Sequence, residues 1–298
     1  MKALCLFSSY YESGPMPYDM VCYLKELKRH CQTVVFITNE KAFLENELQF
    51  CRDFGIEFLP VENDGFDFGM WRKALKVFPP DTYDKVLLVN DSCILFKKLD
   101  NVFEKIEGSD WDYAGLLDSM QIQYHLHSYF LVIGKKAFTL LRQYFDEHNS
   151  QTNIYQTIRT FEVGLSVYME QCGMKLGSVY HHNVCAPDLN PAYSGIEPLI
   201  KEGFPLIKKK IMFGTFRKPE IRSLIRNGFK WSSDYYFDLI VKNTLAHEAI
   251  LDFELLKKEC DAHSNKLRNG WYTLYNFIVD MARRIPGVKQ VYRFIFVR

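Results

Sequence analysis

The sequence has few of the patterns that assign a chain to a protein class at first sight. Its eight cysteines form no C-x-x-C pair and are scattered over positions 5, 22, 31, 51, 93, 172, 185 and 260. Most of them stand inside apolar patterns, as small hydrophobic side chains do. We therefore predict reduced thiols in a cytosolic protein, and we infer from the cysteines neither a disulfide framework nor a zinc site.

An excess of one charge and long apolar runs are missing as well. The formal net charge is +1, so no global field attracts nucleic acid or acidic partners. No run of about 18 apolar residues occurs, so the sequence predicts no transmembrane helix. The start, MKALCLFSSYYESG, has one lysine and five apolar residues before it turns polar, too few for the core of a signal peptide. We expect a cytoplasmic protein that does not bind nucleic acid.

The glycine fingerprint of dinucleotide-binding enzymes is also missing. After the first apolar run the sequence reads SSYYESG, where an oxidoreductase with a Rossmann sheet would carry G-x-G-x-x-G. An oxidoreductase is therefore disfavoured.

What the sequence does contain is a regular alternation of strand and helix patterns. Hydrophobic residues make up 48% of the chain and charged residues 24%, which is ordinary for a globular protein. Short apolar runs predict strands at 3–7, 33–38, 56–61 and 85–89, with helical patterns between them at 18–30, 40–54 and 69–78. Strands that alternate with helices indicate a parallel sheet covered on both faces. Further strands are predicted at 112–118, 127–134 and 175–180, and further helices at 135–147 and 162–172.

The alternation divides the chain into three parts. We predict one α/β domain at 1–183, a proline-rich closing segment at 184–214 and a helical C-terminal extension at 215–298.

Polar residues follow two of the predicted strands. Asn90-Asp91-Ser92 comes directly after the run KVLLV, and in sheets flanked by helices ligands bind at the carboxyl ends of strands. Asp91 there is either part of an Asx turn or a ligand of Mg²⁺ or Mn²⁺ that neutralises a diphosphate. Asn63-Asp64-Gly65, Asp67 and Gly69 lie between a strand and a helix, where Asp67 is either a helix cap or part of a loop around a nucleotide.

Later residues could act on a second substrate. His125 and His127 share one face of a strand, where they are either ordinary buried histidines or contacts for an acceptor. Glu162 is expected at the start of a helix, whose dipole favours the ionised carboxylate. It is either a general base or a first-turn residue that only complements the dipole. His181 and His182 follow the last strand and could bind a metal. Lys208 and Lys209 either hold phosphate or lie on a solvated face.

The order of these elements resembles the rhamnan synthesis F family of bacterial glycosyltransferases over roughly residues 1 to 214. The residues that carry the resemblance are Ser9-Tyr10-Tyr11, Glu62 to Gly69 with Trp71, Ala74 and Leu75, Leu88 to Cys93, Gly115-Leu116, His125, Ser128-Tyr129-Phe130, Phe161 to Leu165 and Phe204 to Lys208. The resemblance implies a GT-A-like fold, with a Rossmann-type mixed sheet that is flanked by helices and binds a nucleotide sugar.

The resemblance also implies a role for each site residue. Donor-binding residues would be Ser8, Tyr10, Tyr11, Asn63, Gly65, Asp67, Gly69, Asn90, Asp91, Ser92, Lys208 and Lys209. Glu162 would be the base, Asp118 the rival base or an acceptor ligand, and His125 and His127 acceptor contacts. Asp91, His181 and His182 would hold a metal. Because N-D-S has one carboxylate where the usual D-x-D has two, the divalent metal, Mg²⁺ or Mn²⁺, stays an open question.

The expected activity is transfer of rhamnose from dTDP-rhamnose, with inversion, to a growing cell-surface polysaccharide or lipid-linked glycan such as lipopolysaccharide O-antigen. The alternative is an inactive nucleotide-sugar-binding subunit. The segment 271–298 carries Arg283, Arg284, Lys289, Arg293 and Arg298 against one acid, Asp280, among seven aromatic residues. It either binds an anionic membrane surface, which would make the protein peripheral on the inner face, or packs on the catalytic domain.

Overall fold

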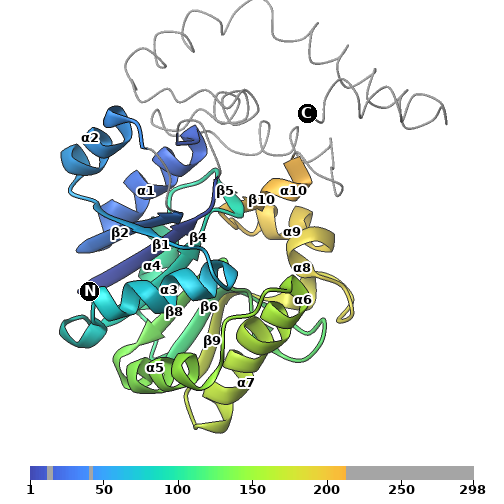
Figure 1. Cartoon of the computed structure of the whole chain (residues 1–298). Helices are drawn as coiled ribbons and strands as arrows, with labels where there is room; N and C mark the ends of the chain where they lie inside the picture. Colours follow the sequence, from blue (N-terminus) through green and yellow to red (C-terminus); the bar gives the residue numbers. More distant parts are fainter. Residues whose placement is uncertain (12–15, 40–42, 213–298) are drawn as a thin grey trace, which may run out of the picture. The chain divides into compact units, whose positions relative to one another are not determined.

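The computed structural model describes residues 1–11, 16–39 and 43–212 (Figure 1). The predicted helical extension at 215–298, with its basic aromatic segment, lies outside the described residues, as do the last two residues of the closing segment. Within the described part of the chain, no helix combines the length and the apolar character needed to cross a membrane.

In the described part, eight strands form one mixed sheet. Their order is β3-β2-β1-β4-β8-β6-β7, and β9 pairs with β6. The strands of this sheet are β1 (Ala3–Ser9), β2 (Thr33–Asn39), β3 (Glu57–Val61), β4 (Lys85–Asn90), β6 (Tyr113–Ser119), β7 (His125–Leu126), β8 (Phe130–Gly134) and β9 (Leu176–Tyr180). The first four run parallel, whereas β8 is antiparallel to both β4 and β6.

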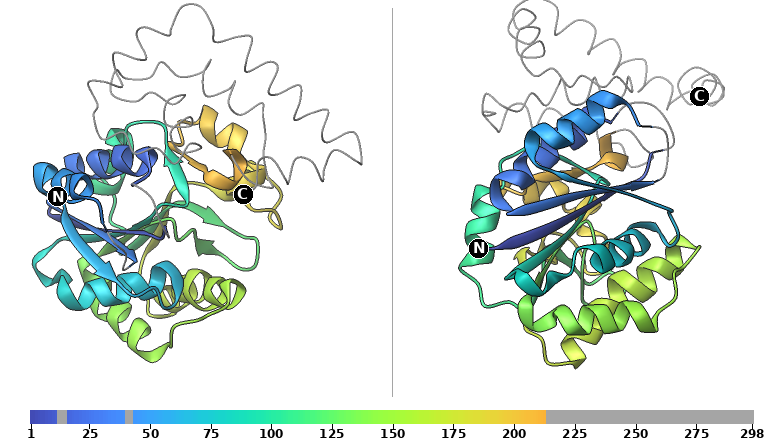
Figure 2. Two further views of the ribbon diagram at one scale, coloured as in Figure 1. Left: turned by 45° about the horizontal axis from the view of Figure 1, so that its top comes forward. Right: turned by 60° about the vertical axis from the view of Figure 1, so that its left-hand side comes forward.

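Helices cover both faces of this sheet (Figure 2). On one face lie α1 (Tyr18–His30), α2 (Glu45–Phe54) and α4 (Asp100–Glu107), and on the other α3 (Phe66–Val77), α5 (Phe138–Glu147) and α7 (Gly164–Gln171). Residues of α3, α5 and α7 share one hydrophobic core with alternate residues of the strands, for example Leu4 and Leu6 of β1. The expected α/β architecture, a Rossmann-type mixed sheet flanked by helices, is confirmed.

The segment after β9 returns to the sheet edge. It forms α8 (Pro191–Ser194), α9 (Ile196–Lys201), β10 (Leu206–Lys208) and α10 (Lys209–Met212). β10 pairs antiparallel with β5 (Cys93–Leu95), so that Lys208 stands opposite Cys93. The closing segment thereby brings its lysines to the end of β4.

Several predicted element boundaries differ from the structure. The strand expected at 127–134 begins only at Phe130, as β8, because His127 donates its N–H to the Leu117 carbonyl just after β7 and a turn follows. The helix expected to begin at 69 begins at Phe66. The helix expected to begin at 162 begins earlier, at Ile154, as α6 (Ile154–Thr157) and a π-helical turn (Ile158–Val163) that continues into α7. Glu162 therefore does not stand at a free helix start, and the helix dipole does not explain its ionisation.

Candidate functional site

The ends of β1 and β4 meet the first turn of α3 at Asp67. Ser8 and Asn90 are neighbours in the register of β1 and β4. Ser8 Oγ donates to Asp67 Oδ1 at 3.1 Å, and Asn90 Nδ2 donates to Asp67 Oδ2 at 2.7 Å. Three residues that were predicted to bind the donor thus form one hydrogen-bonded group.

Two glycines create this meeting point. Gly65 has a φ of 91° and precedes Phe66, which also has a positive φ, 57°. The left-handed pair turns the chain sharply into α3. A Cβ at Gly69 would lie 1.7 Å from the Asp64 carbonyl oxygen, so the turn packs directly on the helix backbone. The glycines of the segment G-F-D-F-G therefore set the position of Asp67.

Asp67 is a carboxyl group with an altered acidity. Burial and then the neighbouring Asp91 charge raise the pKa of Asp67 to about 7, although the hydrogen bonds from Ser8 and Asn90 lower it. Near neutral pH this carboxyl is part protonated. The edge of the sheet consequently carries less negative charge than two ionised aspartates would give it.

Asp91 and Asn90 leave few oxygens uncommitted at the end of β4. Asp91 Oδ2 accepts from Ser9 Oγ at 2.8 Å and lies 3.7 Å from Lys209 Nζ. Asn90 Oδ1 accepts from the Ser92 backbone N–H at 3.1 Å and from Ser92 Oγ at 2.6 Å. The Asx turn that the sequence left open is thus present.

Two lysines face the strand ends. Lys208 Nζ donates to Ser92 Oγ at 3.0 Å and lies 4.2 Å from the centre of the Tyr129 ring. Lys209 Nζ pairs with Asp19 Oδ2 of α1 at 2.9 Å. Burial lowers the pKa of Lys209, but Asp19 and Asp91 outweigh it and raise the pKa above its ordinary value. Lys209 is therefore a cation at neutral pH.

Not every predicted donor residue joins this group. The Tyr11 backbone N–H donates to Asn39 Oδ1 at 3.1 Å and its hydroxyl to Glu47 Oε1 at 3.2 Å, toward β2 and α2. Tyr10 is half-exposed, and Asn63 lies exposed in the loop before α3. A donor-binding role for Tyr10, Tyr11 and Asn63 stays a prediction.

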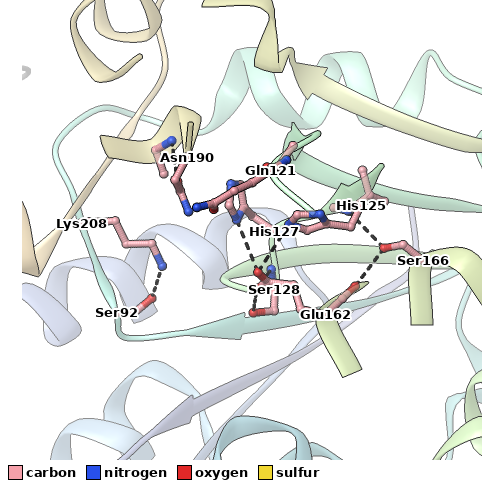
Figure 3. Close-up of polar contacts among 12 residues, drawn as sticks. Ser92, Gln121, His125, His127, Ser128, Glu162, Ser166, Asn190 and Lys208 are labelled. Carbon is pink, nitrogen blue, oxygen red and sulfur yellow. Dashed lines mark hydrogen bonds and ion pairs between the residues drawn. The ribbon is translucent and has the colours of Figure 1, made fainter. Parts of the chain in front are cut away.

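A second polar group surrounds Glu162 (Figure 3). Ser128 donates to Glu162 Oε2 through its backbone N–H at 2.9 Å and through its hydroxyl. His125 Nε2 and His127 Nδ1 each lie 3.6 Å from Glu162 Oε1. Burial by itself raises the pKa of Glu162, but the interactions with His127, then His125 and Ser128, outweigh it, and the pKa lies well below its ordinary value. Glu162 is ionised for this reason and not because of a helix dipole.

The ring of Tyr129 joins the two groups. It stacks on His127, with ring centres 5.4 Å apart and planes at 22°, and it also lies next to Lys208. Figure 3 shows Lys208 directed toward Ser92, with His127, Ser128 and Glu162 gathered beside them. A cationic group and an anionic group are thus separated by a single aromatic side chain.

Asp118 forms a third group, with the two late histidines. His182 donates to Asp118 Oδ1 through its backbone N–H at 2.5 Å, and its Nδ1 lies 2.9 Å from the same oxygen. His181 Nδ1 lies 3.2 Å from Asp118 Oδ2. The structure brings His181 and His182 to Asp118, and no contact in the described residues joins either histidine to Asp91.

A metal at the end of β4, as GT-A enzymes use, does not fit the donor atoms there. The Asn90 oxygen is engaged by Ser92, both Asp67 oxygens accept hydrogen bonds from Ser8 and Asn90, and Asp91 faces the ammonium of Lys209. A hard divalent ion needs several free oxygens. Within the described residues, two other groups have the spacing for an ion: His125, His127 and Glu162, and Glu26, His30 and Asp100.

The comparison with known families decides what the chain is. Residues 34–274 match the family model of rhamnan synthesis protein F. The chain belongs to the rhamnan synthesis protein F family. The match continues well past residue 214, where we expected the resemblance to end, and it includes Asp67, Asp91, His125 and Glu162. Membership of the rhamnan synthesis protein F family is thus confirmed for most of the chain, including residues outside the described structure.

Individual relatives of this member of the rhamnan synthesis protein F family are distant. Virulence protein VirA of Vibrio anguillarum is 24% identical over 60% of this chain and 69% of its own. The glycosyltransferase GlyE of Streptococcus pneumoniae has a TM-score of 0.42 and 14% identity, covering 88% of this chain and 64% of GlyE. The 4-diphosphocytidyl-2C-methyl-D-erythritol synthase of Anaerococcus prevotii has a TM-score of 0.40 and 10% identity over 60% of this chain and 86% of its own. Likeness at these TM-scores carries no conclusion about activity.

Some residues of the site were given no role in the sequence-based prediction. Asp19, Ser128 and Tyr129 all contact predicted site residues. Ser128 and Tyr129 directly follow His127, so the polar run before β8 was a usable signal for them. Asp19 lies in an amphipathic helix and has no sequence signal of its own.

Proposed function

We propose that this member of the rhamnan synthesis protein F family is a glycosyltransferase. It would move rhamnose from dTDP-rhamnose, with inversion, to a growing cell-surface polysaccharide or lipid-linked glycan. The observation that carries the proposal is the Tyr129 ring between two groups of opposite charge, Lys208 on one side and the Glu162 group on the other. Glycosyl transfer needs a cation for the departing diphosphate and a base for the acceptor, about one sugar apart.

The group around Lys208 would be the donor side. Lys208 and Lys209 would bind the diphosphate as point charges and stabilise it as it leaves. Asn90, Asp91 and Ser92 would position those lysines, since Ser92 and Asp91 are their contacts at the end of β4. Part-protonated Asp67 would limit the repulsion between the sheet edge and the diphosphate.

The group around Glu162 would be the acceptor side. The acceptor oxygen would form a bond to the anomeric carbon as the bond from that carbon to the nucleoside diphosphate breaks. Glu162 would take the hydroxyl proton, and His125 and His127 would line the acceptor site. Asp118 remains the second candidate base, although His181 and His182 already contact both of its oxygens.

We propose the same division of the chain that the sequence indicated. The nucleotide-sugar domain would cover 1–183, with 184–214 closing the site and 215–298 reaching a membrane. If the basic segment binds the headgroups near a lipid-linked acceptor, the full chain should sediment with anionic vesicles at low salt and be released at high salt. A chain that ends near residue 265 is the comparison. A full chain that stays in the supernatant at low salt would refute the membrane role.

The activity is tested with a panel of nucleotide sugars against the full chain. We expect dTDP-rhamnose to raise the thermal midpoint, because a ligand of the native state stabilises it. Release of dTDP should then require an acceptor glycan. Lys208→Ala should lose the thermal shift, whereas Lys210→Ala, two residues further on and exposed, should keep it. A shift with no turnover on any acceptor would favour the inactive binding subunit, and no shift with any nucleotide sugar would refute both.

A further inference from the structure

The atoms that face one another in the Glu162 group are not hydrogen-bonded. His125 Nε2 and His127 Nδ1 are both 3.6 Å from Glu162 Oε1. Nitrogen and oxygen atoms in a hydrogen bond are closer, at about 2.7–3.2 Å. Ligand atoms around a tetrahedral ion at about 2.1 Å lie about 3.4 Å from one another. The spacing therefore suits an ion between the three side chains better than direct contact.

Neighbouring groups already hold two of the three side chains in the orientation of metal ligands. His125 Nδ1 lies 2.8 Å from the Gln123 carbonyl oxygen. A carbonyl oxygen only accepts, so Nδ1 carries the proton, and in the neutral ring the lone pair of Nε2 points toward Glu162. Ser128 occupies Oε2 of Glu162 through two hydrogen bonds and leaves Oε1 for another partner. A lone pair that faces a carboxylate oxygen is repelled unless a cation lies between them.

Burial adds a second line of support. The side chains of His125 and His127 are 3% and 5% exposed, and that of Glu162 is 14% exposed. Packing therefore holds the three side chains in place and keeps water from their facing atoms, as around the ligands of a bound metal ion.

We propose that His125, His127 and Glu162 bind one divalent transition-metal ion, such as zinc or cobalt. Two imidazole nitrogens and one carboxylate oxygen favour these ions over Mg²⁺, which prefers oxygen ligands only. The site is distinct from the end of β4, where lysines supply the positive charge. It lies across Tyr129 from Lys208, on the acceptor side.

The ion would change how the acceptor is activated, a role that rests on the proposed function. Three protein ligands leave a fourth position open, as catalytic zinc sites do. A hydroxyl bound there has a lowered pKa and gives up its proton more readily. With the ion bound, Glu162 would hold the metal, and the hydroxyl proton would pass to Asp118, the second candidate base. The binding of the ion requires neither donor nor acceptor.

Cobalt binding by the untagged full chain, stripped with a chelator, tests the proposal directly. We expect one equivalent of Co²⁺ to give visible absorption bands, and Zn²⁺ to displace it. His125→Gln and His127→Gln should each weaken the binding at least about tenfold. His30→Gln, in the second group with Glu26 and Asp100, should leave it unchanged and is the matched control.

The outcomes separate this proposal from the proposed function. Absence of Co²⁺ binding, or binding that survives both His125→Gln and His127→Gln, overturns the metal site even if the enzyme transfers sugar. Loss of binding in His30→Gln alone assigns the ion to the other group and also overturns it. Circular dichroism of each variant shows that it is folded, and two ligand variants keep the test valid if one fails to fold. Metal binding without sugar transfer would leave the site standing and refute the transferase.

Discussion

Asp91 has two partners at the same carboxylate oxygen, Oδ2. Ser9 donates to it, and Lys209 lies beside it with Asp19 as a second, closer partner. Because Lys209 keeps Asp19 when Asp91 is removed, Asp91→Ala should lower the free energy of unfolding by less than about 1 kcal/mol. We expect sugar transfer to disappear, which a donor-turnover assay beside urea denaturation would show. Normal turnover by folded Asp91→Ala would remove Asp91 from the donor side.

Glu162 is the residue on which the proposed acceptor side depends. Glu162→Gln keeps the shape and one acceptor oxygen for Ser128 but removes the charge. We expect kcat to fall by about 10²–10⁴-fold with donor affinity unchanged. Steady-state kinetics and donor titration measure the two quantities. Glu170→Gln, exposed on α7, is the control. A parallel loss of donor affinity would make Glu162 a structural residue.

At the scale of elements, the start of α3 depends on the close approach at Gly69. A Cβ there would meet the Asp64 carbonyl at 1.7 Å, whereas at Gly108, after α4, the nearest atom is the Glu104 carbonyl oxygen at 3.3 Å. Gly69→Ala should therefore destabilise the fold by about 1–3 kcal/mol, and Gly108→Ala by clearly less. Urea denaturation of both variants measures the difference. Equal stabilities would show that the turn yields to the methyl group.

Elements with a local pattern could be predicted from the sequence, and those with distant partners could not. The apolar runs of β1 to β4 and the helices between them follow from periodicity alone. The pairing of β10 with β5 joins residues more than a hundred positions apart, which no local pattern contains. The helix at Glu162 was placed too late, because the π-helical turn before α7 hides the 3.6-residue period.

The same distinction holds for the site. The sequence showed that Asp67, Asp91 and Glu162 carry carboxyl groups. It also placed them after strands or near helices. The partners of these residues could not be predicted. The hydrogen bonds of Ser8 to Asp67 and of Lys208 to Ser92 depend on how separate elements pack. His181 and His182 were assigned to Asp91 by order along the chain, but the register of β6 and β9 places them at Asp118.

At the scale of the whole molecule, acid should weaken the fold through Glu26. The buried Glu26 carboxylate joins α1 to the start of α4, accepting from the Leu99 backbone N–H at 2.8 Å and pairing with Arg29 at 2.8 Å. Burial raises the pKa of Glu26, but His30, Leu99 and Arg29 outweigh it and lower the pKa from 4.5 to about 2. A carboxyl with a lowered folded-state pKa stabilises the fold above its unfolded pKa and loses that contribution as the pH falls toward the folded value.

We therefore expect protonation of Glu26 to lower the free energy of unfolding by about 2 kcal/mol between about pH 5 and pH 2. This value is reduced for solvent screening, because the Arg29 side chain is half-exposed. Glu26→Gln should be less stable at neutral pH and should lack this part of the acid dependence. Urea denaturation across a pH series compares the two proteins. Parallel curves for both would show that Glu26 does not couple protons to folding.

The pairing of β10 with β5 also has a consequence for the order in which the protein is made. Lys208 contacts Ser92 across 116 positions of the sequence. A ribosome that adds about 5–20 residues per second needs about 6–23 s to pass from one to the other. For that time the nascent sheet exposes Asp91 and Ser92 without their lysines. If these lysines bind the donor, as we propose, the complete donor site can form only after the ribosome has added Lys208 and Lys209.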